Sequence, residues 1–532
     1  MAMECPTCGG HLVFKPGKQL LECPYCNSII DAKNYKLGNA AEKQSLEINQ
    51  VDEQITVDIY TCKHCGAELC APEEQIVSFC MYCGGQATLL QKATSMQRPA
   101  GIIPFKINKD RVRKIYSEKI AKIPFVPRDF KNANFIEGFR GIYIPYWKTS
   151  SDIEGKEAQM DGVVTTSYSS YDLKEFFDYS IRLNGRAQTG TYDASEAFDD
   201  TIASAISPFK RTSIVPFEEG YLSGFYADKA TVGPETYSEL IKDQFAESIK
   251  KEVKEQMGKM ETSSKMIREK LPLERFNSES LLFPVWFLTW RKKNRVSYSV
   301  MNGETGTLCV EAPVDYAKFF LTAFVVSAIL SGIMCLIPAF IIPYRVATIS
   351  GVLLYISSYV YRRELRRINQ TVNHTFDIGS NFFKNRGAKL NPFSNSETKG
   401  SCALIGLNVI QYLFVAFCII FSLNASSSDD VLSFFAVTFV LQLILFAKQL
   451  KQIVHLKNKI GLISMILSVS VMFAGCSIAS RGVQEDMYYY GISIGCLSAM
   501  IINIVTSIFY TNYLATRPVP NFYTREGANN DR

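Results

Sequence analysis

Eight cysteines near the N-terminus repeat one spacing twice. In each copy, two Cys-x2-Cys pairs are separated by 14 residues. The eight are Cys5, Cys8, Cys23, Cys26, Cys62, Cys65, Cys80 and Cys83. One Cys-x2-Cys turn directs two sulfurs to a single point, and a second turn across a short hairpin completes a tetrahedron of thiolates. The spacing therefore predicts two zinc ribbons, each closed around one Zn²⁺.

The residues around these cysteines favour metal binding over redox chemistry. Gly9, Gly66 and Gly84 lie where the chain must bend tightly around a metal. A redox-active Cys-x-x-Cys of the thioredoxin type occurs singly at a strand-to-helix turn, which this Cys-, Gly- and Pro-rich stretch lacks. Because four thiolates leave no open position on the ion, we expect two structural Zn²⁺ ions and no catalytic metal.

The C-terminal part of the chain contains six apolar runs. They cover residues 319–342, 346–361, 403–423, 431–446, 460–479 and 488–510. Most approach or exceed the roughly 20 residues that a helix needs to cross a bilayer. The second and fourth runs have 16 residues each, and a helix of that length spans only about 24 Å. We expect a transmembrane domain of about six helices, with a re-entrant hairpin as the alternative for the first two runs.

Loop charges predict the orientation of these spans, since loops on the cytoplasmic side are enriched in Lys and Arg. Residues 362–402 carry eight such residues and residues 447–459 carry four, whereas the loops on the other side hold only Arg345 and Arg481. Both termini are then cytoplasmic. A reducing cytosol also preserves thiolates for zinc, and no signal-peptide pattern precedes Cys5. We expect a multi-pass protein of the bacterial cytoplasmic (inner) membrane.

The distribution of charge argues against nucleic acid as a partner. Residues 317–532 hold 18 Lys and Arg against 9 Asp and Glu, whereas residues 1–316 hold 39 against 42. The net charge of +6 therefore comes from the region of the apolar runs. The N-terminal region lacks the excess of positive charge that phosphate binding requires.

The middle of the chain predicts a mixed α and β domain. Residues 108–122 and the amphipathic stretch after 236 predict helices, with capping boxes at 193–196 and 236–239. Residues 297–301 and 307–310 flank an Asn-Gly turn and predict a hairpin. The expected fold class is a multidomain membrane protein with two N-terminal zinc ribbons, a cytoplasmic α+β (β-rich) domain and a C-terminal α-helical transmembrane domain. The expected units are ribbon 1 at 1–35, a linker at 36–56, ribbon 2 at 57–95, the α+β domain at 96–316, the transmembrane domain at 317–512 and a cytoplasmic tail at 513–532.

Several stretches of this region together resemble one known family. They are residues 102–106, 125–127, 141–147, 221–229, 284–290 and 301–306. They resemble the body of bacterial TFIIB-type zinc-ribbon membrane proteins, a YdjG-like family, over roughly residues 1–316. The resemblance implies a membrane partner of SPFH (flotillin-like) or phage-shock-type envelope-stress proteins. Some relatives are labelled as helicases, but this chain has no GxxxxGK[ST] loop for ATP.

These features favour a scaffold or adaptor that is anchored in the membrane lipid bilayer and binds a protein partner. We expect no enzyme activity, because the chain has only four histidines, no HExxH, no nucleotide loop and no nucleophile elbow. The acidic residues of the middle region are expected to be caps, turns and solvated carboxylates. They are Asp193, Asp199, Asp200 and Asp228.

A transporter or channel with a zinc-ribbon regulatory domain is the alternative function. Four amides lie at membrane depth, namely Asn408, Gln411, Gln442 and Asn503. We expect them to form interhelical hydrogen bonds, since the carboxylates and arginines that mark ion paths are missing from the apolar runs. Small residues in the first, fifth and sixth runs also allow the close helix packing of a homo-oligomer.

Overall fold

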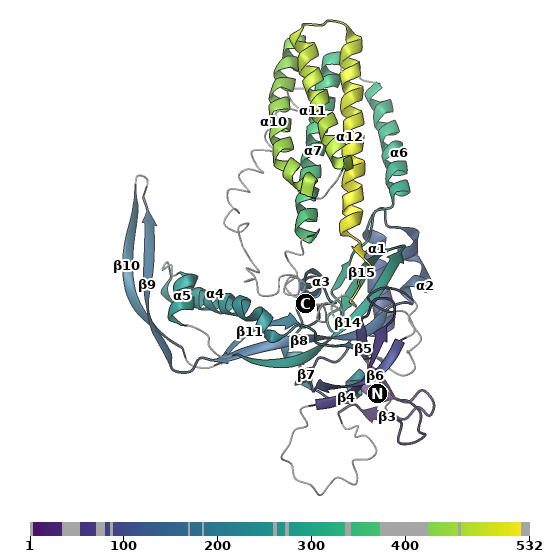
Figure 1. Cartoon of the computed structure of the whole chain (residues 1–532), viewed down its shortest axis with the longest axis vertical. Coiled ribbons are helices and arrows are strands. Elements are labelled where there is room, and N and C mark those ends of the chain that lie inside the picture. The colour runs from purple at the N-terminus through teal and green to yellow at the C-terminus, as the bar shows by residue number, and fades with distance from the viewer. Residues whose placement is uncertain are drawn as a thin grey trace, which may run out of the picture.

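The computed structural model of the chain describes two cysteine-rich ribbons, a β-rich body and a bundle of helices (Figure 1). The described residues are 4–33, 54–70, 80–85, 89–168, 171–183, 186–258, 263–271, 276–335, 342–372, 424–455 and 459–522. This layout confirms the expected fold class. The apolar run 403–423 and most of the linker 36–56 lie outside the described residues.

Twelve strands of the described residues form one sheet that is the centre of the body. The strands are β4 (Gln54–Cys62), β5 (Glu68–Cys70), β6 (Leu89–Gln97), β7 (Gly101–Ile102), β8 (Arg140–Asp152), β11 (Arg186–Asp193), β12 (Val215–Pro216), β13 (Tyr226–Asp228), β14 (Asn277–Lys292), β15 (Arg295–Asn302), β16 (Leu308–Val310) and β17 (Arg517–Pro518). The main path runs β12-β7-β14-β8-β13-β5-β4-β6. Ribbon 2 supplies β4 and β5, so its strands are continuous with the body.

The central strand β14 is buried on both of its faces. Strand β14 lies between antiparallel β8 and β15, and residues Leu281–Leu288 are all buried, because side chains pack on both faces of the sheet. Side chains alternate between the two faces of a strand. Leu282, Trp286 and Leu288 contribute to one hydrophobic cluster, and Leu281, Phe283, Val285 and Phe287 to another. The sheet thus has a separate core on each face.

One ribbon and one helix cover each face of the sheet. Ribbon 1 consists of β1 (Val13–Lys15), β2 (Leu20–Glu22) and β3 (Ile29–Asp31), and it shares its cluster with α1 (Lys109–Lys122). The cysteines of ribbon 2 share the other cluster with α3 (Asp200–Ile206). The two cysteine sites therefore lie on opposite faces of one sheet.

The helices of the body follow the apolar patterns of the sequence, but two of their starts differ from the prediction. The helix predicted at 108–122 is α1. The amphipathic stretch is α4 (Ser238–Met257), which buries Ile241, Phe245, Ile249 and Val253 as expected. The capping box at 236–239 is wrong, because a 3₁₀ turn, Pro234–Tyr237, precedes the helix. The box at 193–196 is wrong too, because α3 begins at Asp200 and Asp199 is its N-cap.

Five described helices lie at one end of the molecule, and all but the first pack into a bundle (Figure 1). They are α6 (Tyr316–Cys335), α7 (Pro343–Val372), α10 (Ser428–His455), α11 (Lys459–Ser480) and α12 (Asp486–Leu514). Three are long and apolar enough to cross a membrane, over Ser428–Ala447, Ile460–Ser480 and Asp486–Leu514. The apolar part of α6, Tyr316–Ile329, is shorter than a span. Three membrane-length helices of the six expected are therefore present among the described residues.

Polar side chains inside the bundle bond to one another. The Gln442 amide of α10 donates to Ser358 Oγ of α7 at 3.0 Å. Asn503 of α12 accepts from Ser464 Oγ of α11 at 2.6 Å and donates to Ser358 Oγ at 3.1 Å. The expectation of interhelical hydrogen bonds is confirmed for Gln442 and Asn503. Asn408 and Gln411 lie outside the described residues.

The last helix returns to the sheet at its end. After α12, strand β17 pairs with β15, and the Arg295 guanidinium donates to the Tyr513 carbonyl at 2.7 Å. Arg517 pairs with Asp199 at 2.8 Å and with Glu311 at 2.5 Å. The chain continues along the body as far as ribbon 2, where the Phe522 N–H donates to the Cys65 carbonyl at 2.6 Å. Residues 513–522 of the expected tail thus pack on the body.

Candidate metal centres

All four cysteine turns use the same local structure. In each, the carbonyl of the first cysteine accepts from the N–H four residues later, and its own N–H donates to the carbonyl five residues later. The residue after the second cysteine has a positive φ in every turn. These residues are Gly9 (71°), Asn27 (57°), Gly66 (75°) and Gly84 (63°). Glycine and asparagine tolerate this left-handed conformation best, so the sequence can form four matching turns.

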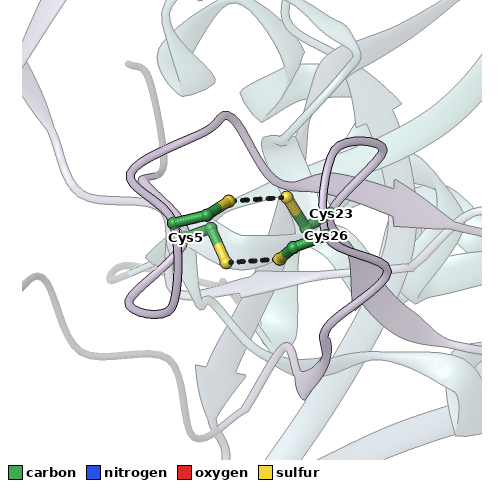
Figure 2. Close-up of side chains that lie close together, drawn as sticks. Cys5, Cys23 and Cys26 are labelled. Atoms are coloured by element: carbon green, nitrogen blue, oxygen red, sulfur yellow. Dashed lines mark hydrogen bonds between the residues drawn. The ribbon is translucent and has the colours of Figure 1, made fainter.

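The four sulfurs of each ribbon converge on one point. In ribbon 1, Cys5 Sγ lies 3.6 Å from Cys26 Sγ, and Cys8 Sγ lies 3.5 Å from Cys23 Sγ (Figure 2). In ribbon 2, the Cys62–Cys83 and Cys65–Cys80 sulfur distances are 3.8 and 3.7 Å. Within each set all four sulfurs are within 4.8 Å of one another. The eight predicted ligands are therefore brought together in the two predicted sets.

These distances match a tetrahedral thiolate site. Zn–S bonds of about 2.3 Å place the corners of a tetrahedron about 3.8 Å apart. A disulfide would instead bring two sulfurs to about 2.05 Å. Both sets can therefore hold a metal ion and are compatible with zinc. A bound ion would link two turns and stabilise the ribbon, and four thiolates would fill its tetrahedral coordination.

The two sites differ in their exposure. Cys5 and Cys23 of ribbon 1 are buried, whereas Cys8 is exposed. All four cysteines of ribbon 2 are buried. The difference arises because all four cysteines of ribbon 2 belong to a hydrophobic cluster of the body, whereas only Cys5 and Cys23 of ribbon 1 do.

Main-chain carbonyls of the second turn of ribbon 2 accept hydrogen bonds from the central strands. Thr289 donates to the Met81 carbonyl, Tyr298 to the Tyr82 carbonyl at 2.7 Å, and Arg291 to the Cys83 carbonyl at 3.3 Å. The Tyr82 ring also contacts the ring of Phe287 on β14. The turn that carries two sulfurs of this site is thereby fixed to β14 and β15.

Tyr82 also reaches a buried carboxylate. Its hydroxyl donates to Asp228 Oδ2 at 2.5 Å, and Ser195 Oγ donates to the same oxygen at 2.5 Å. Burial raises the pKa of Asp228 to about 6, although the hydrogen bonds from Ser195 and Tyr82 oppose the rise. Burial and the Asp228 charge raise the pKa of Tyr82 well above its usual value. Tyr82 is therefore a neutral donor to this carboxylate.

One short segment, residues 219–229, contacts both ribbons. On one side, Phe14 of ribbon 1 packs against the rings of Tyr221 and Phe225, at 5.4 and 6.4 Å between centroids. On the other side, β13 pairs with β5 of ribbon 2, and Asp228 bonds to Tyr82. We call residues 219–229 the bridging segment. It joins the two metal sites through the sheet.

Two glycines of the bridging segment allow ribbon 1 to approach. A Cβ on Gly220 would lie 2.8 Å from the Ala32 carbonyl oxygen. Gly224 has a φ of +83°, and a Cβ there would lie 2.9 Å from Val13 Cγ1. Side chains at these positions would displace the ribbon from the sheet.

The acidic residues singled out in the sequence have different roles. Asp199 is the N-cap of α3 and accepts from the N–H groups of Thr201 and Ile202, as expected for a cap. Burial alone would raise the pKa of Asp199, but the Arg517 guanidinium and the hydrogen bonds from Thr201 and Ile202 together outweigh it, and the pKa lies below its usual value. Asp228 is not a solvated carboxylate, because it is buried beneath ribbon 2. Asp193 is buried as well, and Asp200 lies in the first turn of α3.

Comparison with known proteins gives one distant similarity. Over 239 residues the chain is 25% identical to a Bacillus subtilis (strain 168) protein named "Uncharacterized protein YdjG". The similarity covers 44% of this chain and 69% of that protein. No protein-family model and no solved structure matches the chain. The similarity accords with the resemblance that the sequence motifs indicate, at a level too distant to establish a family.

Proposed function

We propose that this protein is a membrane-anchored zinc-ribbon adaptor whose ribbons and body bind a protein partner at the cytoplasmic face. The proposal is supported by three helices of membrane-crossing length and composition and by two four-cysteine sets that can hold zinc. It is also supported by the Lys- and Arg-rich segments that favour a cytoplasmic position for the body. The metal ions would be structural, and they would hold the binding surface in one shape.

The exposed side of ribbon 1 carries the proposal. Tyr25 is 69% exposed and Ile29 is 57% exposed, and both lie within or next to the second cysteine turn. The ring of Tyr25 lies against Gly10, where a Cβ would come within 2.5 Å of Tyr25 Cδ2. The ring therefore packs on the backbone of Gly10 and leaves most of its surface to solvent. Exposed aromatic side chains on a rigid support are typical anchors of protein interfaces.

Ribbon 1 lies at the end of the body away from the helical bundle (Figure 1). A partner that binds there meets no bilayer, because the body separates ribbon 1 from the helices. Ribbon 2 offers less surface for binding, since its cysteines and the Met81–Tyr82 turn are buried. We therefore assign recognition to ribbon 1 and structural support to ribbon 2.

The test is affinity purification of the full chain from its native host in detergent, followed by mass spectrometry. The Tyr25→Ala, Ile29→Ser variant removes the exposed apolar side chains and leaves all eight cysteines in place. The matched control is Met257→Ser, which removes an exposed apolar side chain at the end of α4 and outside ribbon 1. We expect a stoichiometric partner with the unmodified chain and the control, and its loss with the ribbon variant.

The resemblance to TFIIB-type zinc-ribbon membrane proteins makes SPFH-domain and phage-shock-type proteins the first partners to look for in that experiment. A partner retained equally by both variants would contradict recognition by ribbon 1. No stoichiometric partner in any sample would contradict the adaptor function.

Transport by the helical bundle is the alternative proposal. The polar groups at its centre, from Ser358, Gln442 and Asn503, are the observation that bears on it. Because these groups hydrogen bond to one another, they support helix packing more directly than a solute path. Flux in liposomes reconstituted with the purified chain, measured over a broad panel of ions and solutes, would favour transport.

A further inference from the structure

A long β-hairpin leaves the body beside the helical bundle. It consists of β9 (Lys156–Ser167) and β10 (Asp172–Leu183), which pair with each other along their whole length and with no other described strand. Figure 1 shows the hairpin curving away from the sheet and rising toward the same end of the molecule as the bundle, apart from it, so that its tip lies at the height of the lower part of the helices. The tip is thus far from ribbon 1.

The cover on one face of the hairpin ends before the tip. Met160 is buried, and Val164, Tyr179 and Ile181 of the same face are partly buried, in a small core with α4 and α5 (Ser264–Lys270). Beyond Tyr179, toward the tip, every described residue of β10 is exposed. A two-stranded hairpin without a covered face has marginal stability in water. The distal part of β10 and the turn therefore lack the support that the base receives.

Large apolar side chains nevertheless gather on the exposed part of β10 and at the turn. Phe177 is 46% exposed and lies with Leu173 on the face that α4 and α5 cover at the base. Phe176 is 75% exposed and lies on the opposite face. At the turn, the rings of Tyr168 and Tyr171 stack at 5.0 Å, and both are exposed.

We propose that the tip of this hairpin inserts into the interfacial region of the bilayer that surrounds the helical bundle. A protein partner or a second copy of the chain would cover one face of the hairpin and leave Phe176 or Phe177 in water. Lipid surrounds the tip and accepts apolar side chains on both faces. Tyrosine at the turn suits this position, because its ring is apolar and its hydroxyl remains hydrated at the headgroups.

The chemistry of the tip limits how deeply it inserts. Asp172 and Glu175 lie among the aromatic residues, and carboxylates are costly in the hydrocarbon core. On their outer edges the two strands also pair with no other strand among the described residues, and the hydrocarbon core excludes such open edges. Insertion is therefore shallow. Because the tip has no excess of basic residues, it does not depend on anionic lipid.

The test is quenching of tryptophan fluorescence by lipid in the full-length chain. Tyr171→Trp places a tryptophan at the tip, and the protein is reconstituted into phosphatidylcholine vesicles with or without bromine on the acyl chains. Two reference variants bracket the result: Ile501→Trp, at an exposed position on α12, and Tyr25→Trp, on ribbon 1. The native Trp147, Trp286 and Trp290 lie in strands β8 and β14 of the body and set the background.

We expect brominated lipid to quench the tryptophan of Tyr171→Trp strongly, as it does that of Ile501→Trp, and to leave that of Tyr25→Trp at background. Emission of Tyr171→Trp should also shift to shorter wavelength on reconstitution. Background quenching of Tyr171→Trp together with strong quenching of Ile501→Trp would overturn the insertion of the tip, whether or not the emission shifts.

Background quenching of both variants would overturn the premise, shared with the adaptor function, that the bundle lies in the bilayer. Loss of the protein partner in the ribbon 1 experiment would leave the quenching result unchanged, so the two proposals fail separately.

Discussion

Ribbon 1 and ribbon 2 have the same cysteine spacing and the same turn geometry, but they hold different positions in the molecule. Ribbon 2 is part of the central sheet through β4 and β5, and its second cysteine turn hydrogen bonds to β14 and β15. Ribbon 1 has its own three-stranded sheet and rests on the body through the bridging segment. The comparison shows that a repeated metal motif can be placed in two different surroundings. In the proposed function, one site is a support and the other a presented surface.

Substitution of the cysteine ligands should give the largest difference between the two ribbons in how much of the protein unfolds. We expect Cys62→Ser, Cys65→Ser to unfold much of the body, because a structural zinc contributes about 10 kcal/mol or more to folding and ribbon 2 shares its core with the sheet. Cys5→Ser, Cys8→Ser should unfold ribbon 1 and leave the sheet intact. Limited proteolysis with zinc analysis of the full chain checks this, each variant losing one of two ions. Equal damage from both variants would contradict the distinction.

Substitutions of Arg517 test how far the stability of ribbon 2 depends on the chain that follows the last helix. Arg517→Met should lower the free energy of unfolding by about 3–4 kcal/mol, because it leaves Asp199 and Glu311 without their partner. Arg517→Lys keeps the charge and should cost less. Urea unfolding in detergent gives the values. Protease sensitivity should appear at ribbon 2 and not at ribbon 1, since Arg517 lies over Tyr298, which bonds to Tyr82.

The buried carboxyl group of Asp228 should make the stability of the region around ribbon 2 depend on pH, and the described residues of ribbon 1 do not contact this group. Its pKa is raised to about 6 by burial, so the folded state favours the protonated form, and this contribution to stability is lost as pH rises from about 4 to above 6. Relative to Asp228→Asn, the unmodified protein should lose about 2–3 kcal/mol between pH 4 and pH 7. Both proteins keep all eight cysteines, so any destabilisation from release of zinc at low pH is common to them and cancels in the difference. A constant difference between them across this range would contradict the burial of an ionisable group.

The smallest expected effect concerns the contact of ribbon 1 with the bridging segment. Gly224→Ala should cost about 1–3 kcal/mol and should speed the release of metal from ribbon 1 to a chelator, because the new methyl group meets Val13. Gly155→Ala is the matched control, since Gly155 also has a positive φ, of +73°, and open space around it. The control variant should show the cost of a positive φ at an alanine without any steric contact. Identical chelation kinetics in the two variants would argue that the contact does not hold ribbon 1.

The features that the sequence predicts are those set by local spacing. The Cys-x2-Cys pairs determine both candidate metal sites, and apolar residues at every fourth position locate α4. The asparagine-glycine turn locates β15 and β16. Each depends on residues close together in the chain, whose geometry follows from helix, turn or strand periodicity.

The features that the sequence does not predict are contacts between distant residues. Tyr82 and Asp228 are 146 residues apart in the chain, and Phe522 meets Cys65 from the other end of the sequence. Neither pair has a local pattern that marks it. The capping boxes failed for a related reason, because the starts of α3 and α4 depend on Asp199 and on the turn Pro234–Tyr237, which compete with the predicted starts.

Strand β17 has a consequence for the order in which the protein is made. A chain grows from its N-terminus, so β15 is synthesised before any helix of the bundle, and its partner β17 emerges only after α12. Until then the edge of β15 and the Arg295 guanidinium have no C-terminal chain to bind. The pairing of β17 with β15 therefore forms only when synthesis of the helices is complete. A chain truncated within α12 would leave this edge of β15 unpaired with β17, where proteases could recognise it.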